Sequence, residues 1–263
     1  MNTIGFPSLR LEFNINPVAF WVGDWPVYWY GIIMASAILL AATLALVRAR
    51  NRGMDGDFVI DCIMWAVVSA IVGARLYYVM FYGNWNEILA VWHGGLAIYG
   101  AIIGGAISVW LVCKKKNVSF LQMADCFAPC LLLGQAIGRW GNFINAEAYG
   151  GEYSGLFAMT INGASVHPTF PYESVWCLVG LAVILVVEKA AGLLRPLRYN
   201  WRPRNDGIVF AMYVAWYGLG RMFIEGLRAD SLMLGSLRIS QILAAVSLAV
   251  SIFFIFKLTK RRD

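Results

Sequence analysis

Residues 138–151, GRWGNFINAEAYGG, form the densest group of chemically useful side chains in the sequence. The segment carries one guanidinium, two amides and one carboxylate, on Arg139, Asn142, Asn145 and Glu147. A guanidinium binds phosphate or carboxylate through paired hydrogen bonds, and glycines with positive φ let backbone N–H groups approach the same anion. The segment therefore predicts an anion site. A loop of Asn-capped turns with a headgroup-facing arginine is the alternative interpretation.

Residues 217–230, YGLGRMFIEGLRAD, are a second group of charged side chains. On a helix, Arg221, Glu225 and Arg228 would lie on one face, because they are spaced i, i+4, i+7. Two cations flanking one carboxylate can be a structural ladder of ion pairs. They also leave a net positive charge, and a buried unpaired guanidinium requires an anion. Both interpretations stay open at this point.

His93, in the segment WHGGLAIYG, is one of two histidines, and the other, His167, lies in HPTFPYE. An imidazole suits proton transfer near neutral pH, so His93 is a candidate general base. A histidine at a helix entrance is also commonly a hydrogen-bonding or capping residue. The pair Gly100 and Gly104 in the same region indicates close helix packing.

Arg75, in GARLYY, has a similar ambiguity. It is either a ligand to an anion or the partner of a carboxylate such as Glu147 or Glu173. Five cysteines occur, without a CxxC pair, and the odd number argues against a disulfide framework. We expect buried, unreactive thiols, and neither a metal nor a cofactor.

The elements that must position these residues are membrane helices. Residues of the set AVILMFWYC make up 60% of the 263 positions and charged residues only 14%, with a mean hydropathy of +0.66. This composition excludes a disordered chain, a nucleic-acid-binding domain and an ordinary soluble enzyme. A bilayer core needs about 20 apolar residues per helix. Seven stretches qualify: residues 27–47, 58–82, 96–113, 121–137, 172–187, 208–224 and 239–256.

The sequence thus predicts an all-α integral membrane protein with seven transmembrane helices. We expect one polytopic domain over residues 1–263, with a loop segment at 138–171 and a basic loop at 188–207. Fifteen of the 21 lysines and arginines follow the first, third, fifth and seventh spans. By the positive-inside rule those loops are cytoplasmic, the N-terminus is outside and the C-terminus is inside. Most of the net charge of +6 is then topological.

With this topology, the polar residues at membrane depth gather on one side. Polar groups at that depth are costly and mark functional sites by default. We therefore expect a site at the outer leaflet. The residues on that side are Tyr30, Arg75, His93, the segment 138–151, Tyr172, Glu173, Arg221, Glu225 and Arg228.

The motif GRWGNFINAEAYG resembles the signature G-R-x-G-N-F-x-N-x-E-x-x-G of the prolipoprotein diacylglyceryl transferase family, and it matches every fixed position. The segments WYG, GARLYY, HGGLAIYG, HPTFPYES and YGLGRMFIEGLR resemble other motifs of that family, in the same order. The resemblance covers most of the chain from about Pro26 onward. Residues 152–171 and 189–206 match no family pattern.

The resemblance implies an enzyme of lipoprotein biosynthesis in the bacterial cytoplasmic membrane. Its implied reaction moves the diacylglyceryl group of phosphatidylglycerol to the thiol of a lipobox cysteine in a prolipoprotein signal peptide, and glycerol phosphate leaves. Its partners would be these two substrates and membrane lipids, without nucleic acid.

On this hypothesis the catalytic residues are His93, which takes the thiol proton, and Arg139 and Arg221, which bind the phosphate. Asn142 and Glu147 would orient the headgroup or Arg139. An arginine that lowers the thiol pKa directly is the alternative to His93 as the activating group. The remaining candidates for phosphatidylglycerol binding are Tyr30, Arg75, Gly150, Glu225 and Arg228.

Two other classes of protein would account for an intramembrane arginine cluster. A secondary transporter would place its site at the bilayer midplane between repeats, and this sequence shows neither feature. A lipid-binding protein for an anionic substrate would need the arginines but not His93.

Overall fold

Helices dominate the computed structural model, which describes residues 1–82, 85, 88–89, 94–191, 206–228, 233–234 and 237–260. Within these ranges, seven helices are long and apolar enough to cross a membrane, so the predicted number of spans is confirmed. The helices are α1 (Trp29–Asn51), α2 (Gly56–Tyr82), α3 (Ile98–Lys115), α4 (Phe120–Asn145), α5 (Thr169–Ala190), α6 (Ile208–Glu225) and α7 (Ile239–Lys260).

Short strands lie between and before the helices, and the all-helical prediction missed them. The sheet β2-β1-β5-β6 joins the N-terminal residues to the segment before α5, with Ile4 paired to Ile161. Strands of two to five residues carry too little periodicity to stand out in an aromatic-rich sequence. The strands are β1 (Asn2–Phe6), β2 (Leu11–Ile15), β3 (Val18–Val22), β4 (Trp25–Tyr28), β5 (Met159–Ile161), β6 (Ala164–Val166), β7 (Met233–Leu234) and β8 (Leu237–Arg238), with a 3-10 turn at Pro7–Leu9.

The chain divides into two compact units. Of the described residues, those within 1–43, 127–191 and 206–260 form the first unit, and those within 44–126 form the second. In the second unit, α2 and α3 pack closely through glycine. A Cβ added to Gly100 would lie 2.1 Å from the carbonyl oxygen of Gly73, and one on Gly104 would lie 2.3 Å from that of Ser69. The predicted packing role of Gly100 and Gly104 is therefore confirmed.

Arg48, also in the second unit, lies in α1 and is only 3% exposed. Its Nε donates to the carbonyl of Cys126 at 2.9 Å, and its Nη2 donates to that of Asp125 at 3.1 Å. Asp125 is four residues before Pro129, which lies inside α4 and has no N–H to donate. Arg48 thus supplies a hydrogen bond that the helix cannot. From the sequence, Arg48 was counted among the basic residues that follow the first predicted span, residues 27–47.

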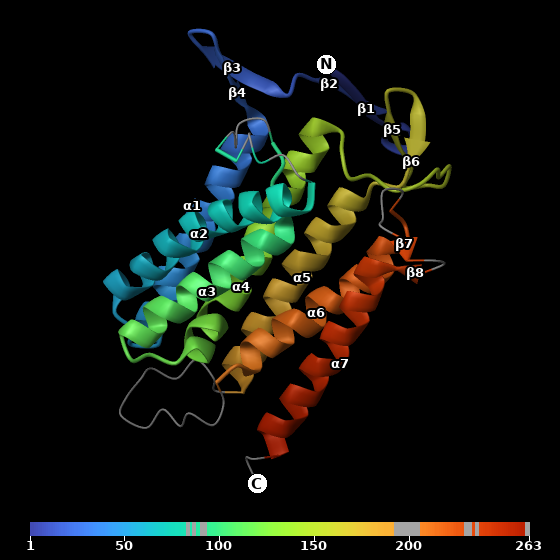
Figure 1. Ribbon diagram of the computed structural model, residues 1–263. Helices are drawn as coiled ribbons and strands as arrows, with labels where there is room; N and C mark the ends of the chain where they lie inside the picture. Colours follow the sequence, from blue (N-terminus) through green and yellow to red (C-terminus); the bar gives the residue numbers. More distant parts are fainter. Residues whose placement is uncertain are drawn as a thin grey trace. The chain divides into compact units, whose positions relative to one another are not determined.

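In the first unit, α4, α5 and α6 share an apolar core that includes Ala128, Leu132, Cys177, Ile184 and Val209. The four-stranded sheet covers the end of α4 that carries Asn145 and the start of α5 (Figure 1). Its strands contribute Ile4, Met159, Ile161 and Val166 to a small core, into which Phe170 of α5 and Phe143 of α4 pack. This core fixes the ends of the two helices on which the charged residues lie.

Candidate anion-binding site

Helix α4 continues through residues 138–145, which were expected to be part of a loop. It ends in two backbone bonds, from Ala146 N–H to Phe143 O (3.1 Å) and from Glu147 N–H to Asn142 O (3.0 Å). This is the Schellman pattern, in which the residue after the helix is left-handed. Ala146 holds that position at φ 54°, where glycine is usual. The four glycines of the segment do not use the positive φ that glycine permits, since none of them is among the positive-φ residues.

The helix end sets up a chain of polar contacts on Arg139. Glu147 Oε1 accepts hydrogen bonds from the amide nitrogens of Asn142 (2.9 Å) and Asn145 (3.4 Å). Because its nitrogen points to Glu147, Asn142 turns its oxygen toward Arg139, whose Nη1 donates to it at 3.3 Å. Glu147 therefore orients Arg139 only indirectly, through Asn142.

The direct carboxylate partner of Arg139 is Glu173 of α5. Arg139 Nη2 pairs with Glu173 Oε2, and Arg221 Nη1 donates to Glu173 Oε1 at 2.8 Å. The Glu173 side chain is 6% exposed, against 22% and 19% for the two arginines. A buried carboxylate thus joins two guanidinium groups that remain partly accessible, one from α4 and one from α6.

The structure brings Arg221, Glu225 and Arg228 close together, but they do not form a continuous row of ion pairs along one helix. Arg221 Nη2 pairs with Glu225 Oε2 at 2.6 Å, as the i, i+4 spacing predicts. Arg228 follows the end of α6, and its Nη1 lies 3.9 Å from Glu173 Oε1. Arg238 donates to the backbone carbonyl of Glu225.

The charges of this group do not cancel. Three arginines, Arg139, Arg221 and Arg228, surround two carboxylates, Glu173 and Glu225. Among these five described side chains, the positive charges exceed the negative ones by one. Each ion pair is only partly screened, since both carboxylates are buried. The arrangement therefore attracts an anion to the accessible sides of Arg139 and Arg221.

Gly150 ties the two charged segments to each other. It forms an antiparallel bridge with Arg228, while Gly151 N–H donates to Leu227 O at 2.8 Å. A Cβ on Gly150 would lie 2.5 Å from His167 Cβ and 2.7 Å from Leu227 O. Close backbone approach therefore requires glycine at this position, as the sequence indicated.

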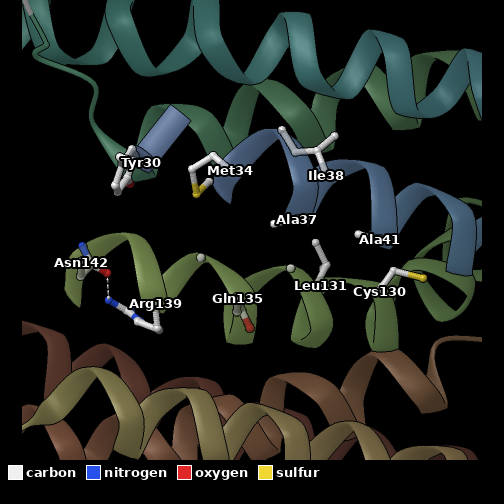
Figure 2. A pocket seen from close by; sticks show the side chains of 12 residues that line it. Tyr30, Met34, Ala37, Ile38, Ala41, Cys130, Leu131, Gln135, Arg139 and Asn142 are labelled. Carbon is white, nitrogen blue, oxygen red and sulfur yellow. Dashed lines mark hydrogen bonds between the residues drawn. The ribbon is translucent and has the colours of Figure 1, made fainter. Parts of the chain in front are cut away.

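A cavity of about 410 Å³ lies between α1 and α4 in the first unit. Figure 2 shows Tyr30, Arg139 and Asn142 at one end of it, with Ala41 and Cys130 at the other. The remaining lining is largely apolar: Met34, Ala37, Ile38, Leu131, Gly134, Gln135 and Gly138. A cavity with a guanidinium at one end and aliphatic walls suits an amphiphile with an anionic head.

The ring of Tyr30 covers Gly141 of α4. A Cβ on Gly141 would lie 2.7 Å from Tyr30 Cδ2, so glycine is what lets the ring lie against the helix. Tyr30 is held there beside Arg139 and Asn142, all three lining the cavity.

The structure thus brings together, in the first unit, all the predicted site residues except Arg75 and His93. Arg75 is in the second unit, where its Nη1 donates to the carbonyls of Gly94 (2.7 Å) and Gly95 (3.2 Å). His93 lies outside the described residues.

Glu173 is the important residue that the sequence prediction missed as a site residue. It was named among the polar residues of the outer side and as a possible partner of Arg75, but it was assigned no role in the site. The signal was present, because Glu173 is a carboxylate at the start of an apolar span, in PYES. The sequence alone does not show which arginines pair with Glu173, because Arg139 and Arg221 lie 34 and 48 positions away.

Comparison with known proteins gives a consistent result. Residues 17–257 match the family model described as prolipoprotein diacylglyceryl transferase. The chain is 41% identical over 255 residues to the phosphatidylglycerol–prolipoprotein diacylglyceryl transferase of Listeria innocua, covering 90% of this chain and 88% of that protein. It is 42% identical over 262 residues to the protein of the same name from Lysinibacillus sphaericus, covering 92% of each. The corresponding protein of Pediococcus pentosaceus is 44% identical over 249 residues, with 88% and 86% covered.

Proposed function

The chain belongs to the prolipoprotein diacylglyceryl transferase family, and from this premise we propose that it transfers the diacylglyceryl group of phosphatidylglycerol to a prolipoprotein cysteine. In the transfer, the thiolate sulfur forms a bond to the terminal glyceryl carbon of the diacylglyceryl group. The bond between that carbon and the phosphate oxygen breaks, and glycerol phosphate leaves with the electron pair. The thiol proton passes to a base. The product is a thioether, and the reaction is the first step of lipoprotein maturation.

The observation that carries this proposal is the position of Arg139. Its guanidinium lines the cavity and also pairs with Glu173, so it lies where the apolar cavity meets the positively charged cluster. Phosphatidylglycerol has the same layout, with apolar chains and one anionic phosphate. An acyl chain in the cavity would leave the phosphate near Arg139 and Arg221, with Tyr30 and Asn142 beside the headgroup.

The cluster also supplies what the leaving group needs. Negative charge builds on the phosphate oxygen as the C–O bond breaks, and preorganised guanidinium donors stabilise it. Glu173 holds Arg139 and Arg221 in place, so little reorganisation is required during the reaction. Arg228, Glu225 and Gly150 support this arrangement through their contacts with Glu173, Arg221 and each other.

The thiol must lose its proton before it can attack, since the thiolate is the nucleophile. We assign this step to His93 as general base. The alternative is that an arginine of the cluster lowers the thiol pKa and His93 is structural. Arg75 is a candidate for holding the segment after His93, because it binds the carbonyls of Gly94 and Gly95.

For the orientation, we propose an outward-facing N-terminus, a cytoplasmic C-terminus and a site open toward the outer leaflet. The distribution of the basic residues supports this topology. In intact cells, a membrane-impermeant maleimide should label D24C, between β3 and β4, but not K115C at the end of α3. The five native cysteines are buried and give little background. The reverse labelling pattern would overturn the topology.

The function is tested with purified protein, vesicles of phosphatidylglycerol and a lipobox peptide. The expected result is a gain in peptide mass of one diacylglyceryl unit, together with release of glycerol phosphate. Vesicles of phosphatidylcholine should give no product. If both substrates bind and the peptide mass is unchanged, the protein is a lipid-binding protein or a transporter and not a transferase.

A further inference from the structure

Trp176 of α5 and Trp216 of α6 hold each other through two matched hydrogen bonds. The indole Nε1 of Trp176 donates to the backbone carbonyl of Trp216 at 3.0 Å, and the indole Nε1 of Trp216 donates to that of Trp176 at 2.9 Å. The two rings stack, with centroids 4.5 Å apart and planes at 20°. In an apolar environment an indole N–H requires such a partner, so these bonds are expected to persist.

Each indole also lies over a glycine of the facing helix. A Cβ on Gly180 would lie 2.3 Å from Trp216 Nε1, and a Cβ on Gly220 would lie 2.2 Å from Trp176 Nε1. Both glycines follow the tryptophan of their own helix by four residues, one helical turn. The motif W-x-x-x-G therefore occurs on both helices, and we call the four residues the tryptophan clasp.

The clasp fixes how far α5 and α6 can slide along each other. Any shift by one residue would place a side chain where a glycine now lies under an indole. It would also break both indole hydrogen bonds at once. The register between the two helices is therefore set by steric fit and by donor position together.

The ion pair between Glu173 and Arg221 depends on that register. Glu173 precedes Trp176 by three residues, and Arg221 directly follows Gly220. At 1.5 Å per residue, Glu173 lies about 4.5 Å along α5 from Trp176, and Arg221 lies about 7.5 Å along α6 from Trp216. The two helices run in opposite directions, so both displacements lead from the clasp toward the same ion pair.

Two further hydrogen bonds connect this pair of helices to α4. Ser174 Oγ donates to the carbonyl of Ala136 at 2.9 Å, and Gln135 Nε2 donates to the hydroxyl of Tyr213 at 2.9 Å. These bonds attach α5 and α6 separately to the helix of Arg139. The clasp connects α5 directly to α6.

We propose that the tryptophan clasp is a positioning element of the transfer reaction. It holds Glu173 against Arg221, and through Glu173 it aligns Arg221 with Arg139 so that both reach one phosphate. Trp176 and Trp216 touch neither substrate in this arrangement and act only through the ion pair. The inference rests on the proposed function, because it is the lipid phosphate that the aligned arginines bind.

The test measures steady-state kinetics of W176F, W216F and G180A against both substrates, with melting temperature and size-exclusion profile in detergent recorded for each. Matched controls are W65F and G105A. Trp65 is 58% exposed on α2. A Cβ on Gly105 of α3 meets its nearest atoms at 3.7 and 3.9 Å, which is ordinary contact. Benzothienylalanine at position 216 adds a variant of native shape that lacks only the N–H donor, in case a substitution prevents folding.

For each clasp variant we expect kcat/KM for phosphatidylglycerol to fall at least about tenfold, with a raised lipid KM and an unchanged peptide KM. A purely structural role would instead reduce the fraction of active enzyme, so kcat would fall while both KM values stayed constant. Either that result or unchanged kinetics of the benzothienylalanine variant would overturn the inference. The proposed function would still stand in both cases, provided that the wild-type protein transfers the diacylglyceryl group. A wild-type protein that transfers nothing would overturn both.

Discussion

Arg139 of α4 and Glu173 of α5 form an ion pair, and the same carboxylate binds Arg221 of α6 through its other oxygen. One buried carboxylate thus joins the arginines of two separate motifs, residues 138–151 and 217–230, in a single site. Arg139 also faces the cavity that begins at Tyr30. The consequences of this geometry for activity can be tested residue by residue.

Replacing Glu173 with glutamine should lower kcat/KM for phosphatidylglycerol by about 100-fold, the usual cost of misplacing a reacting group by about 1 Å. Without the carboxylate, Arg139 and Arg221 repel each other and lose their common partner. The peptide KM should stay constant, because the ion pairs of Glu173 within the described part of the chain are with Arg139, Arg221 and Arg228. Glu12 in β2 is exposed, and E12Q serves as the matched control. Equal loss for both variants would contradict the assignment.

Replacing Arg139 with lysine should reduce transfer by about 100-fold or more, which is typical for removal of a donor to a developing charge. Lysine keeps the charge but cannot pair with Glu173, donate to Asn142 and bind phosphate in one plane. Transfer rates measured from peptide mass, with R10K as an exposed control, check this prediction. Full activity of R139K would remove the phosphate role of Arg139.

Replacing Gly141 with alanine should displace Tyr30, since the new Cβ would lie 2.7 Å from its ring. Such overpacking costs about 1–3 kcal/mol, so we expect about tenfold weaker binding of phosphatidylglycerol. Alanine also has a higher helix propensity than glycine by about 1 kcal/mol, which keeps α4 itself intact. Measuring the lipid KM and the melting temperature of G141A and of the control G105A separates an effect on lipid binding from an effect on stability. An unchanged lipid KM would show that Tyr30 does not contact the lipid.

Hydropathy alone predicted the seven membrane helices, because each must bury about 20 apolar residues regardless of its neighbours. The polar side chains at membrane depth likewise indicated Arg139 and Arg221, since their cost requires a function. Neither hydropathy nor the cost of buried polar groups predicted that α4 continues to Asn145. Two glycines and two asparagines in residues 138–145 resemble a loop, but packing of Phe143 into the small core favours helix there.

Contacts between distant positions could not be predicted, because nothing local in the sequence encodes them. Glu173 could have paired with several arginines by charge alone, and packing of α4, α5 and α6 selected Arg139 and Arg221. The same is true of Ile4, whose partner strand begins more than 150 residues later. The family resemblance indicated candidate site residues without giving the geometry among them.

The assignment of His93 can be tested by replacement with glutamine and a pH profile. A neutral imidazole is needed to accept the thiol proton. If His93 is the base, transfer by the wild-type protein should rise with pH as the imidazole loses its proton, and H93Q should lose activity about 100-fold, within the usual range for a general base. H167Q is the comparison variant. Near-normal activity of H93Q over the whole pH range would leave activation of the thiol to an arginine.

Arg48 and Pro129 should be coupled in stability, although neither is assigned a part in the transfer. R48M removes the donor to the carbonyl of Asp125, which Pro129 cannot replace, and should destabilise the protein by about 1–3 kcal/mol. In a P129A background the restored helical N–H supplies that donor, so R48M should cost measurably less. Reversible unfolding of the four proteins of this double-mutant cycle gives the coupling free energy. If the free-energy costs of R48M and P129A are additive, the hydrogen bond from Arg48 to Asp125 does not replace the one that Pro129 lacks. The burial of Arg48 is then explained by its bonds to Cys126 and its other partners.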